Sequence, residues 1–441
     1  MFENKKIFIL GMARSGYNVA KLLYKNYKNN EIVITDKNDQ DEEKVKELES
    51  LGVKFIKSDN PLEIFNDSFD MVIKNPGVMP THPLLTYASS KNIPIYNEME
   101  VAYHFLPKNI TIIGVTGSNG KTTTTTMIYE LLKLMKKSVV LGGNIGYPLS
   151  EVIPLIHEGD ILLLEISDHQ LINFNDFKTN ISVLTNLCQT HLDYHGTYEN
   201  YKKVKHNIFN HHTKEDIAII NAGNEDSMVL TSDINSTKEY FNGKDAYVKD
   251  NAIYIEDEKI IDTKDILVKG KHNYENIMAC LLVIKEFGID KEIIKKFFST
   301  FKGVEHRIEF ICEKGGVKYY NDSKATNPTS TITALNAFEE DTYLILGGME
   351  RCQDFHELDN AIKNVKKIYA IGQTTEKVYE YAQSMNILCE KCYTLNEAMN
   401  KIKKDNIKKG VVLLSPASAS WDQYDKFETR GEEFKNIAKS M

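Results

Sequence analysis

The stretch Gly114-Val-Thr-Gly-Ser-Asn-Gly-Lys-Thr122 comes directly after the mostly apolar run Ile110–Ile113. This order predicts a strand, a glycine-rich loop and then a helix that begins near Lys121. Such a loop turns backbone N–H groups onto one anion, and the helix dipole adds positive character there. Lys121 can reach the β/γ-phosphates of a nucleotide, and the Thr122 hydroxyl can ligate Mg²⁺. The stretch therefore predicts an α/β domain that binds a nucleoside triphosphate.

The spacing departs from the strict phosphate-loop pattern at one position. That pattern has a glycine five residues before the second glycine, and Val115 stands there in this chain. A plain glycine turn before a helix is the alternative interpretation, because a chance Gly-Lys-Thr is common. The agreement of strand, loop and helix signals favours the nucleotide loop.

The composition is that of an ordinary soluble globular protein, with 42% hydrophobic and 26% charged residues in a chain of 441. That length predicts two to four domains of roughly 150 residues each. The net charge is −8 without a strong basic patch, so we expect no nucleic-acid partner. No apolar stretch approaches the ~20 residues that span a bilayer, and Ile7–Leu10 is too short for a signal peptide. We therefore expect a cytoplasmic protein without membrane insertion.

Six cysteines are scattered at positions 188, 280, 312, 352, 389 and 392. Cys389-Glu-Lys-Cys392 is a lone CxxC motif with no second pair to complete a zinc site. Two interpretations stay open for it, a thioredoxin-like redox pair and a pair of reduced thiols.

Strands and helices alternate along the chain, which is typical of parallel α/β sheets. We predict three α/β domains: a Rossmann-like domain at 1–99, a central P-loop ATPase-like domain with a mostly parallel sheet at 100–303, and a Rossmann-like domain at 304–441. Beyond Ile110–Ile113, the predicted strands are Lys6–Leu10, Glu31–Thr35, Phe69–Ile73, Ser138–Leu141, Ile161–Ile166, Ile181–Leu187, Val317–Tyr320, Tyr343–Leu346, Lys367–Ile371 and Val411–Leu414. Predicted helices include Tyr17–Lys25 and Tyr274–Phe287.

The turn at 11–16 resembles a dinucleotide fingerprint but has Ala13 in place of the middle glycine. A side chain there weakens close backbone approach to a pyrophosphate, so a nicotinamide cofactor is doubtful. Asp36, about 20 residues further on, could still bond a ribose or a base. Binding of part of a nucleotide and a purely structural turn both remain open.

Polar side chains follow two predicted strands of the central domain. Glu165 ends an apolar strand, where a carboxylate suits a metal ligand, and a solvent-facing acid is the alternative. His191, Asp193 and His195 cluster after another strand, and His191 is the stronger candidate for a metal or phosphate contact. Lys205 lies in a basic segment, Tyr201–Phe209, which taken alone indicates a solvated helix face.

Several polar loops follow strands in the third domain, as a ligand cleft requires. Arg307 can bind phosphate bidentately. The other loops cluster hydroxyl, amide and charged groups at 321–328, 347–351 and 414–431.

Taken together, these motifs resemble the Mur ligase family of ATP-dependent amide-forming enzymes, and the match spans essentially the whole chain. The motifs that carry it are Thr116–Thr122, Gly143-Asn144-Ile-Gly146, Glu165, His191, Lys205, His306-Arg307 and Asn321–Thr326. The tail from Ser415 through Ser420 and Phe427 to Arg430-Gly431 is similar to the branch that adds D-glutamate.

The resemblance implies a role for each domain. The first would bind the UDP part of UDP-N-acetylmuramoyl-L-alanine, with Arg14, Ser15, Asp36, Lys37, Gly77 and, from the second domain, Asn144. The second would bind ATP through Gly117, Ser118, Asn119, Gly120, Lys121, Thr122 and Thr123, with Arg307 and Asp322 from the third. The third would bind D-glutamate through Lys324, Thr326, Arg351, Ser420 and Phe427.

The resemblance also implies the chemistry. The substrate carboxylate would attack the γ-phosphate of ATP to give an acyl phosphate, which the D-glutamate amine would then attack. Lys121, Glu165, His191 and Lys205 would be catalytic. Two Mg²⁺ ions are implied, held by Thr122, Glu165, His191 and a CO₂-derived carbamate on Lys205. We expect a monomer.

The chain departs from the family pattern at a few positions, which concern local contacts and not the reaction class. Asp168-His169 stand where the family has Ser-x, and Thr190 replaces a common acid. Trp421 replaces a smaller aliphatic residue, and Arg351 stands where some relatives have lysine. The alternatives are sibling ligases for L-alanine or a diamino acid, folyl-polyglutamate synthase, and a regulatory P-loop NTPase.

Overall fold

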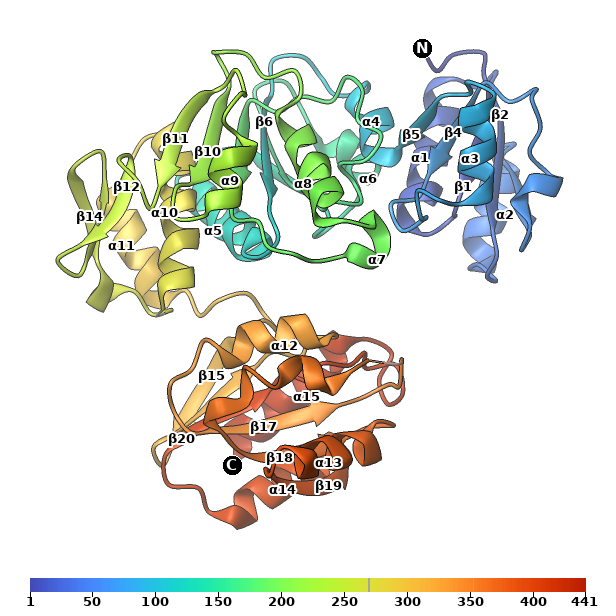
Figure 1. Ribbon diagram of the computed structural model, residues 1–441. Coiled ribbons are helices and arrows are strands. Elements are labelled where there is room, and N and C mark those ends of the chain that lie inside the picture. The colour runs from blue at the N-terminus through green and yellow to red at the C-terminus, as the bar shows by residue number, and fades with distance from the viewer. Residues whose placement is uncertain (269, 352) are drawn as a thin grey trace. The chain divides into compact units, whose positions relative to one another are not determined.

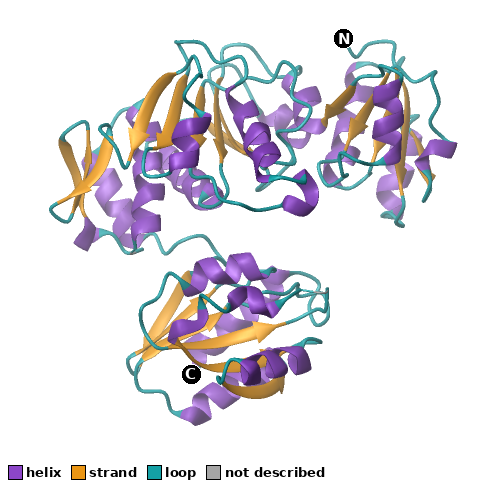
Figure 2. Cartoon of the chain, viewed as in Figure 1, coloured by secondary structure: helices purple, strands orange, loops and turns teal. Residues whose placement is uncertain are grey.

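Three β-sheets of mostly parallel strands form the framework of the computed structural model (Figures 1 and 2). The structure describes residues 1–268, 270–351 and 353–441. The chain divides into two compact units, Met1–Ser299 with two of the sheets and Thr300–Met441 with the third. Among the described residues, no helix is both long and apolar enough to cross a membrane.

The first sheet has five parallel strands in the order β3-β2-β1-β4-β5. These strands are β1 (Lys6–Leu10), β2 (Glu31–Asp36), β3 (Lys54–Lys57), β4 (Met71–Lys74) and β5 (Ile95–Asn97). The helices are α1 (Arg14–Asn26), α2 (Glu42–Ser50), α3 (Pro83–Ser90) and α4 (Glu98–Tyr103). Apolar residues of α1, α2 and α4 cover one face of the sheet, and those of α3 cover the other. Because the strand order reverses between β1 and β4, a ligand crevice is expected at their carboxyl ends.

The second sheet has nine strands in the order β14-β13-β12-β11-β10-β9-β6-β8-β7. They are β6 (Thr111–Thr116), β7 (Val139–Gly143), β8 (Ile161–Glu165), β9 (Ile181–Leu184), β10 (Ile217–Asn221), β11 (Thr237–Phe241), β12 (Ala246–Lys249), β13 (Ala252–Ile255) and β14 (Glu258–Asp262). The helices are α5 (Lys121–Leu134), α6 (Leu149–Val152), α7 (Leu192–His195), α8 (Tyr198–His206), α9 (Glu225–Leu230), α10 (Lys271–Lys285) and α11 (Lys291–Thr300). Strand β6 pairs in parallel with β8 and β9, so the loops that follow these three strands meet at one edge.

The sheet of the second unit has six strands in the order β15-β16-β20-β17-β18-β19, and only β15 runs antiparallel to its neighbour. They are β15 (Glu309–Lys314), β16 (Val317–Asn321), β17 (Thr342–Gly347), β18 (Val365–Ile371), β19 (Leu388–Tyr393) and β20 (Gly410–Leu414). The helices are α12 (Pro328–Leu335), α13 (Thr375–Ser384), α14 (Leu395–Asp405) and α15 (Phe427–Ser440). Short 3₁₀ segments lie at Pro61–Glu63, Ile153–Leu155, Asn207–Phe209, Thr263–Asp265, Phe355–Leu358 and Ile362–Asn364.

The predicted α/β class with mostly parallel sheets is confirmed. All the predicted strands are present within a few residues of their expected bounds, because strands covered on both faces read as continuous apolar runs. The division at 99/100 falls inside α4, which packs against both α1 and α6. The three-domain bounds therefore stay a prediction.

The structure favours the reduced-thiol interpretation of the CxxC motif. Cys389 and Cys392 are free thiols on β19, and burial raises their pKa values to about 11 and about 12. A reactive pair needs a lowered thiol pKa. These cysteines are packing residues.

Candidate active site

The loop between β6 and α5 has a backbone that requires its glycines. Gly117 and Gly120 have φ angles of +145° and +81°, in the region that favours glycine. A Cβ atom on Gly117 would lie 1.9 Å from Thr185 Oγ1, and one on Gly120 would lie 2.3 Å from Asn276 Oδ1. Helix α5 then begins at Lys121, as predicted.

Polar contacts hold this loop in place. Asn186 O accepts from the backbone N–H of Ser118 at 2.9 Å, and Asn186 Oδ1 accepts from that of Asn119 at 3.0 Å. Lys121 Nζ donates back to Gly117 O at 2.8 Å and to Ser118 O at 2.9 Å. The ammonium group therefore lies against the loop, where loops of this kind hold phosphates.

Glu165, at the end of β8, is 1% exposed, so the interpretation as a solvent-facing acid is wrong. Its Oε1 accepts a hydrogen bond from Asn144 Nδ2 at 2.6 Å. Its Oε2 is buried and has no hydrogen-bond partner within the part of the chain that the structure describes. A buried carboxylate oxygen without a donor suits a bound cation.

Lys205 is fully buried, so the solvated-face interpretation does not apply to it. Its Nζ donates to Thr116 Oγ1 at 2.9 Å and lies 3.8 Å from Asp168 Oδ1. Burial, together with the nearby Lys121 ammonium, lowers the pKa of Lys205 to about 7, although Asp168 and Glu165 oppose this shift. A sizeable share of neutral amine is therefore present near neutral pH.

Asp168 joins both histidines of the cluster, a role that the sequence did not reveal. Its Oδ2 lies 2.9 Å from His191 Nδ1 and 2.7 Å from His195 Nε2. Burial by itself would raise the pKa of Asp168, but these hydrogen bonds and Lys205 hold it well below its usual range. His191 itself has a φ angle of +51°, a conformation that is uncommon outside glycine and concentrates at functional sites. The side chain of Asp193 lies outside the described residues.

These residues fit the cations that the resemblance implies. Thr122 is buried beside the loop, and the unpartnered Glu165 oxygen supplies a hard anionic ligand. Asp168, His169 and His191 place potential ligand atoms within 4.8 Å of one another. The donor set therefore suits one cation at Glu165 and another beside His191.

The turns after β1 and β2 are joined through Asp36. Its Oδ2 accepts from the N–H of Met12 at 2.9 Å, and its Oδ1 accepts from that of Asn38 at 3.0 Å. Lys37 is exposed beside it. Asp36, which the sequence predicts could bond a ribose or a base, therefore also fixes the turn at 11–16.

The turn after β4 also contacts the turn at 11–16. Asn75 Nδ2 donates to Ser15 Oγ at 3.0 Å, and Asn75 Oδ1 accepts from the Gly77 N–H at 3.1 Å. Ser15, Asp36 and Gly77 thus gather at the carboxyl ends of β1, β2 and β4, the expected ligand position.

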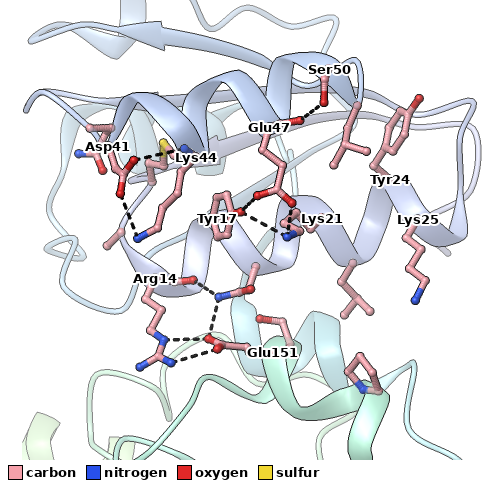
Figure 3. Close-up of a pocket in the computed structure, with 18 of the residues that line it drawn as sticks. Arg14, Tyr17, Lys21, Tyr24, Lys25, Asp41, Lys44, Glu47, Ser50 and Glu151 are labelled. Carbon is pink, nitrogen blue, oxygen red and sulfur yellow. Dashed lines mark hydrogen bonds and ion pairs between the residues drawn. The ribbon is translucent and has the colours of Figure 1, made fainter.

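Two predicted UDP-binding residues are engaged elsewhere. Asn144 bonds Glu165, and Arg14 Nε and Nη2 donate to Glu151 Oε2 and Oε1 at 2.8 and 3.0 Å. Arg14 also lines a cavity of about 1190 Å³ between α1, α2 and Glu151 (Figure 3). Two ion pairs line this cavity, Arg14 with Glu151 and Lys21 with Glu47. These pairs neutralise much of the charge on the cavity wall.

The second unit carries a buried acid on the loop after β16. Asp322 is 3% exposed, and its carboxylate accepts from Ser415 Oγ at 2.7 Å and from the Ile308 N–H at 3.1 Å. Burial raises the pKa of Asp322 to about 7 despite these bonds and the nearby Arg307. Asp322 and Arg307, both predicted nucleotide ligands, are therefore neighbours.

Arg430 organises the tail loops, which the sequence did not predict. It is 1% exposed, with Nε donating to Ser323 Oγ at 3.0 Å and Nη2 donating to Ser323 O and Ser418 O at 2.9 and 3.1 Å. Ser323 Oγ in turn donates to Phe427 O at 2.8 Å. One guanidinium thus ties the 321–326 loop to the loop after β20.

The predicted D-glutamate residues are only partly brought together. The Lys324 N–H donates to His306 O at 3.0 Å, and the Phe427 ring centroid lies 6.0 Å from that of His306. Ser420 Oγ is buried and unpartnered among the described residues, which suits a ligand contact. Thr326 is exposed. Arg351 is exposed, and its Cζ lies 5.5 Å from the centroid of the Trp421 ring. Within the described part of the chain, it makes no hydrogen bond or ring contact with the other predicted D-glutamate residues.

Comparison with known proteins shows which family has this arrangement of residues. The model of the Mur ligase middle domain matches residues 115–284, and that of the Mur ligase glutamate ligase domain matches residues 306–418. A UDP-N-acetylmuramoylalanine--D-glutamate ligase of Geobacillus sp. (strain WCH70) is 41% identical over 441 residues, covering 98% of this chain and 97% of the relative. The chain belongs to the Mur ligase family. A Mur ligase of the same name from Bacillus cereus (strain G9842) is 40% identical over 442 residues, with the same coverage.

Solved Mur ligases share the fold. A MurF ligase from Thermotoga maritima in complex with ADP has a TM-score of 0.57 at 21% identity, and the match covers 99% of each chain. A UDP-N-acetylmuramate-alanine ligase from the same organism has a TM-score of 0.59 at 18% identity, again over 99% of each chain. At these identities the likeness shows the Mur ligase fold alone. Family membership rejects the regulatory NTPase interpretation.

Proposed function

We propose that this chain is an ATP-dependent ligase that joins D-glutamate to UDP-N-acetylmuramoyl-L-alanine in the synthesis of peptidoglycan precursors. The observation that carries the proposal is the near-complete match, at about 40% identity, to relatives that bear this name. The gathering of a phosphate-type loop, Glu165 and Lys205 at one sheet edge supports it. Because ATP and a nucleotide-linked acceptor are consumed, we place the reaction in the cytoplasm, and all the proposed residues come from one chain, as in a monomer.

In the first step, an oxygen of the acceptor carboxylate attacks the γ-phosphorus of ATP. The bond to the β–γ bridging oxygen breaks, and the products are an acyl phosphate and ADP. A carboxylate is a poor acyl donor, so this phosphorylation is why ATP is needed. Lys121 and the N–H groups of the loop hold the phosphates and offset the charge that gathers there.

We assign one Mg²⁺ to Thr122 and Glu165, and another to His191 and Lys205. When bound, such ions neutralise phosphate charge and orient the reacting groups. Asn144 orients Glu165 through its amide, and Asp168 orients His191. The outer contacts of metal ligands fix their orientation in this way.

We further propose that Lys205 carries a carbamate, which makes it an anionic ligand. Carbamylation needs a neutral amine, and the buried site lowers the pKa of Lys205 to about 7. Lys205→Ala should then lose most activity and regain part of it with a short carboxylic acid. Unchanged turnover would reject this role.

In the second step, the amine of D-glutamate attacks the acyl carbon, phosphate leaves and the amine loses a proton. We propose Lys324, Ser420 and Phe427 as D-glutamate contacts, with Thr326 and Arg351 as outer candidates. Arg307 and Asp322 are proposed nucleotide contacts.

The decisive assay measures phosphate release by the purified chain with ATP and Mg²⁺, across a panel of UDP-muramoyl acceptors and amino acids. We expect release only with UDP-N-acetylmuramoyl-L-alanine together with D-glutamate, and not with L-glutamate. Release that does not depend on an amino acid would favour a hydrolase. Lys121→Ala should abolish acyl-phosphate formation, with Lys133→Ala at the far end of α5 as the matched control.

A further inference from the structure

Lys74, the last residue of β4, is a buried lysine that the proposed chemistry leaves unused. It is 1% exposed, and its Nζ donates to Val78 O and to the Tyr194 hydroxyl, each at 3.2 Å. Burial lowers the pKa of Lys74 to about 8. A lysine is costly to bury, so its place here calls for a reason beyond filling space.

Tyr194 forms the other half of the contact, 120 residues further along the chain. Its hydroxyl oxygen lies 2.9 Å from both Pro76 O and Val78 O, and its one proton can be donated to either carbonyl. The same oxygen accepts the hydrogen bond from Lys74 Nζ. Its ring packs edge-on against His169, with centroids 4.0 Å apart. Tyr194 is thus tied to the turn after β4 through its hydroxyl and to His169 through its ring.

The two segments joined in this way both carry proposed site residues. The turn after β4 holds Gly77, which the family resemblance predicts to contact UDP. Helix α7, which contains Tyr194, begins directly after His191 and contains His195. A helix of four residues has almost no stability of its own, so its position depends on tertiary contacts.

We propose that Lys74 and Tyr194 are positioning residues that set the spacing between the UDP-binding turn at 75–78 and the helix that follows His191. This inference rests on the proposed function. Lys74 fixes the tyrosine oxygen and the carbonyl of Val78 at once, so that the turn and α7 move as one body. This spacing would hold the bound acceptor at a fixed position relative to the phosphates of ATP.

The test compares Tyr194→Phe, which removes only the hydroxyl, with Tyr198→Phe as the matched control. Tyr198 lies in α8 and spends its hydroxyl on Asp226 at 2.8 Å, away from the UDP-binding turn. In Tyr194→Phe, we expect kcat/KM for the UDP acceptor to fall about tenfold, the cost of a lost buried hydrogen bond to a charged group. The KM for ATP should stay within about twofold of the wild type, and amide hydrogen exchange should quicken at 75–78 and 191–195.

Lys74→Met provides a second variant of similar length, with Lys178→Met as its control, because Lys178 pairs with Asp216 outside this contact. We expect Lys74→Met to reproduce the acceptor-specific loss. If both variants match their controls, or if all kinetic constants fall in parallel with the melting temperature, the positioning role is wrong while the ligase function stands. If the wild type shows no D-glutamate-dependent phosphate release, the proposed function itself fails.

Discussion

The two units bury charge in different ways. In the first unit, Lys205 lies 3.8 Å from Asp168, and the nearby Glu165 keeps one buried oxygen without a described partner. In the second unit, Arg430 donates to hydroxyl and carbonyl oxygens, and Asp322 accepts from the Ser415 hydroxyl and the Ile308 N–H.

This difference separates two uses of buried polar groups. An open acceptor beside ionisable side chains can exchange partners when a ligand or cation arrives. A hydrogen-bond network around one buried guanidinium fixes loops and is expensive to disturb. We therefore expect substitutions in the first network to change activity, and those around Arg430 to change stability.

The largest expected effect is that of Glu165→Gln. The amide keeps an acceptor for Asn144 but loses the charge that a cation needs, so kcat should fall by about 100- to 1000-fold. The urea midpoint should stay near that of the wild type. Glu158→Gln, at an exposed position before β8, is the control. A loss of stability comparable to the loss of activity would contradict the comparison.

Arg430→Met should destabilise the second unit by about 3 kcal/mol, because several buried oxygens lose their donor. Urea unfolding followed by hydrogen exchange within residues 300–441 measures this. Arg351→Met removes an exposed arginine and should cost far less. Equal effects of the two substitutions would show that the network around Arg430 is not what holds these loops.

The contributions of Asp322 and Lys205 to the pH dependence of stability should have opposite signs. The folded pKa of Asp322 is about 7 against an ordinary 3.8, so folded protein keeps a proton that unfolded protein loses, and stability falls as pH rises from about 4 to 7. The folded pKa of the unmodified Lys205 amine is about 7 against 10.5, so in protein freed of CO₂ stability rises between about pH 7 and 10.5. Each slope approaches about 1.4 kcal/mol per pH unit. Asp322→Asn and Lys205→Met should each flatten only its own slope in denaturant titrations, whereas Asp341→Asn should change neither.

The smallest expected effect is that of Trp421→Ala. The side chain is 62% exposed and its ring face lies against Arg351, so the unfolding free energy should change by less than about 1 kcal/mol. If KM for D-glutamate nevertheless rises severalfold, this departure from the family pattern shapes the amino-acid site. Tyr393→Ala, another exposed aromatic, is the control for surface effects.

Much of the first site could be predicted because parallel strands bring their carboxyl ends to one edge. Glu165 ends a strand, Gly117 and His191 follow strands, and β6, β8 and β9 prove to be neighbours. Lys205 could not be derived that way, since a basic helix segment looks solvated, and only the family resemblance singled it out. Arg14, a predicted UDP contact, also pairs with Glu151, a contact 137 residues away in the chain that no local pattern encodes.

Local order in the chain determined the class of fold, the phosphate-type loop and most of the strand-end residues, because apolar runs and glycine positions act over short distances. Tertiary structure alone decided that Asp168 joins two histidines, that Arg430 ties two loops, and that Lys74 meets Tyr194. Each of these depends on segments that only folding brings together, and on burial, which turns an ordinary lysine or aspartate into a group with an altered pKa.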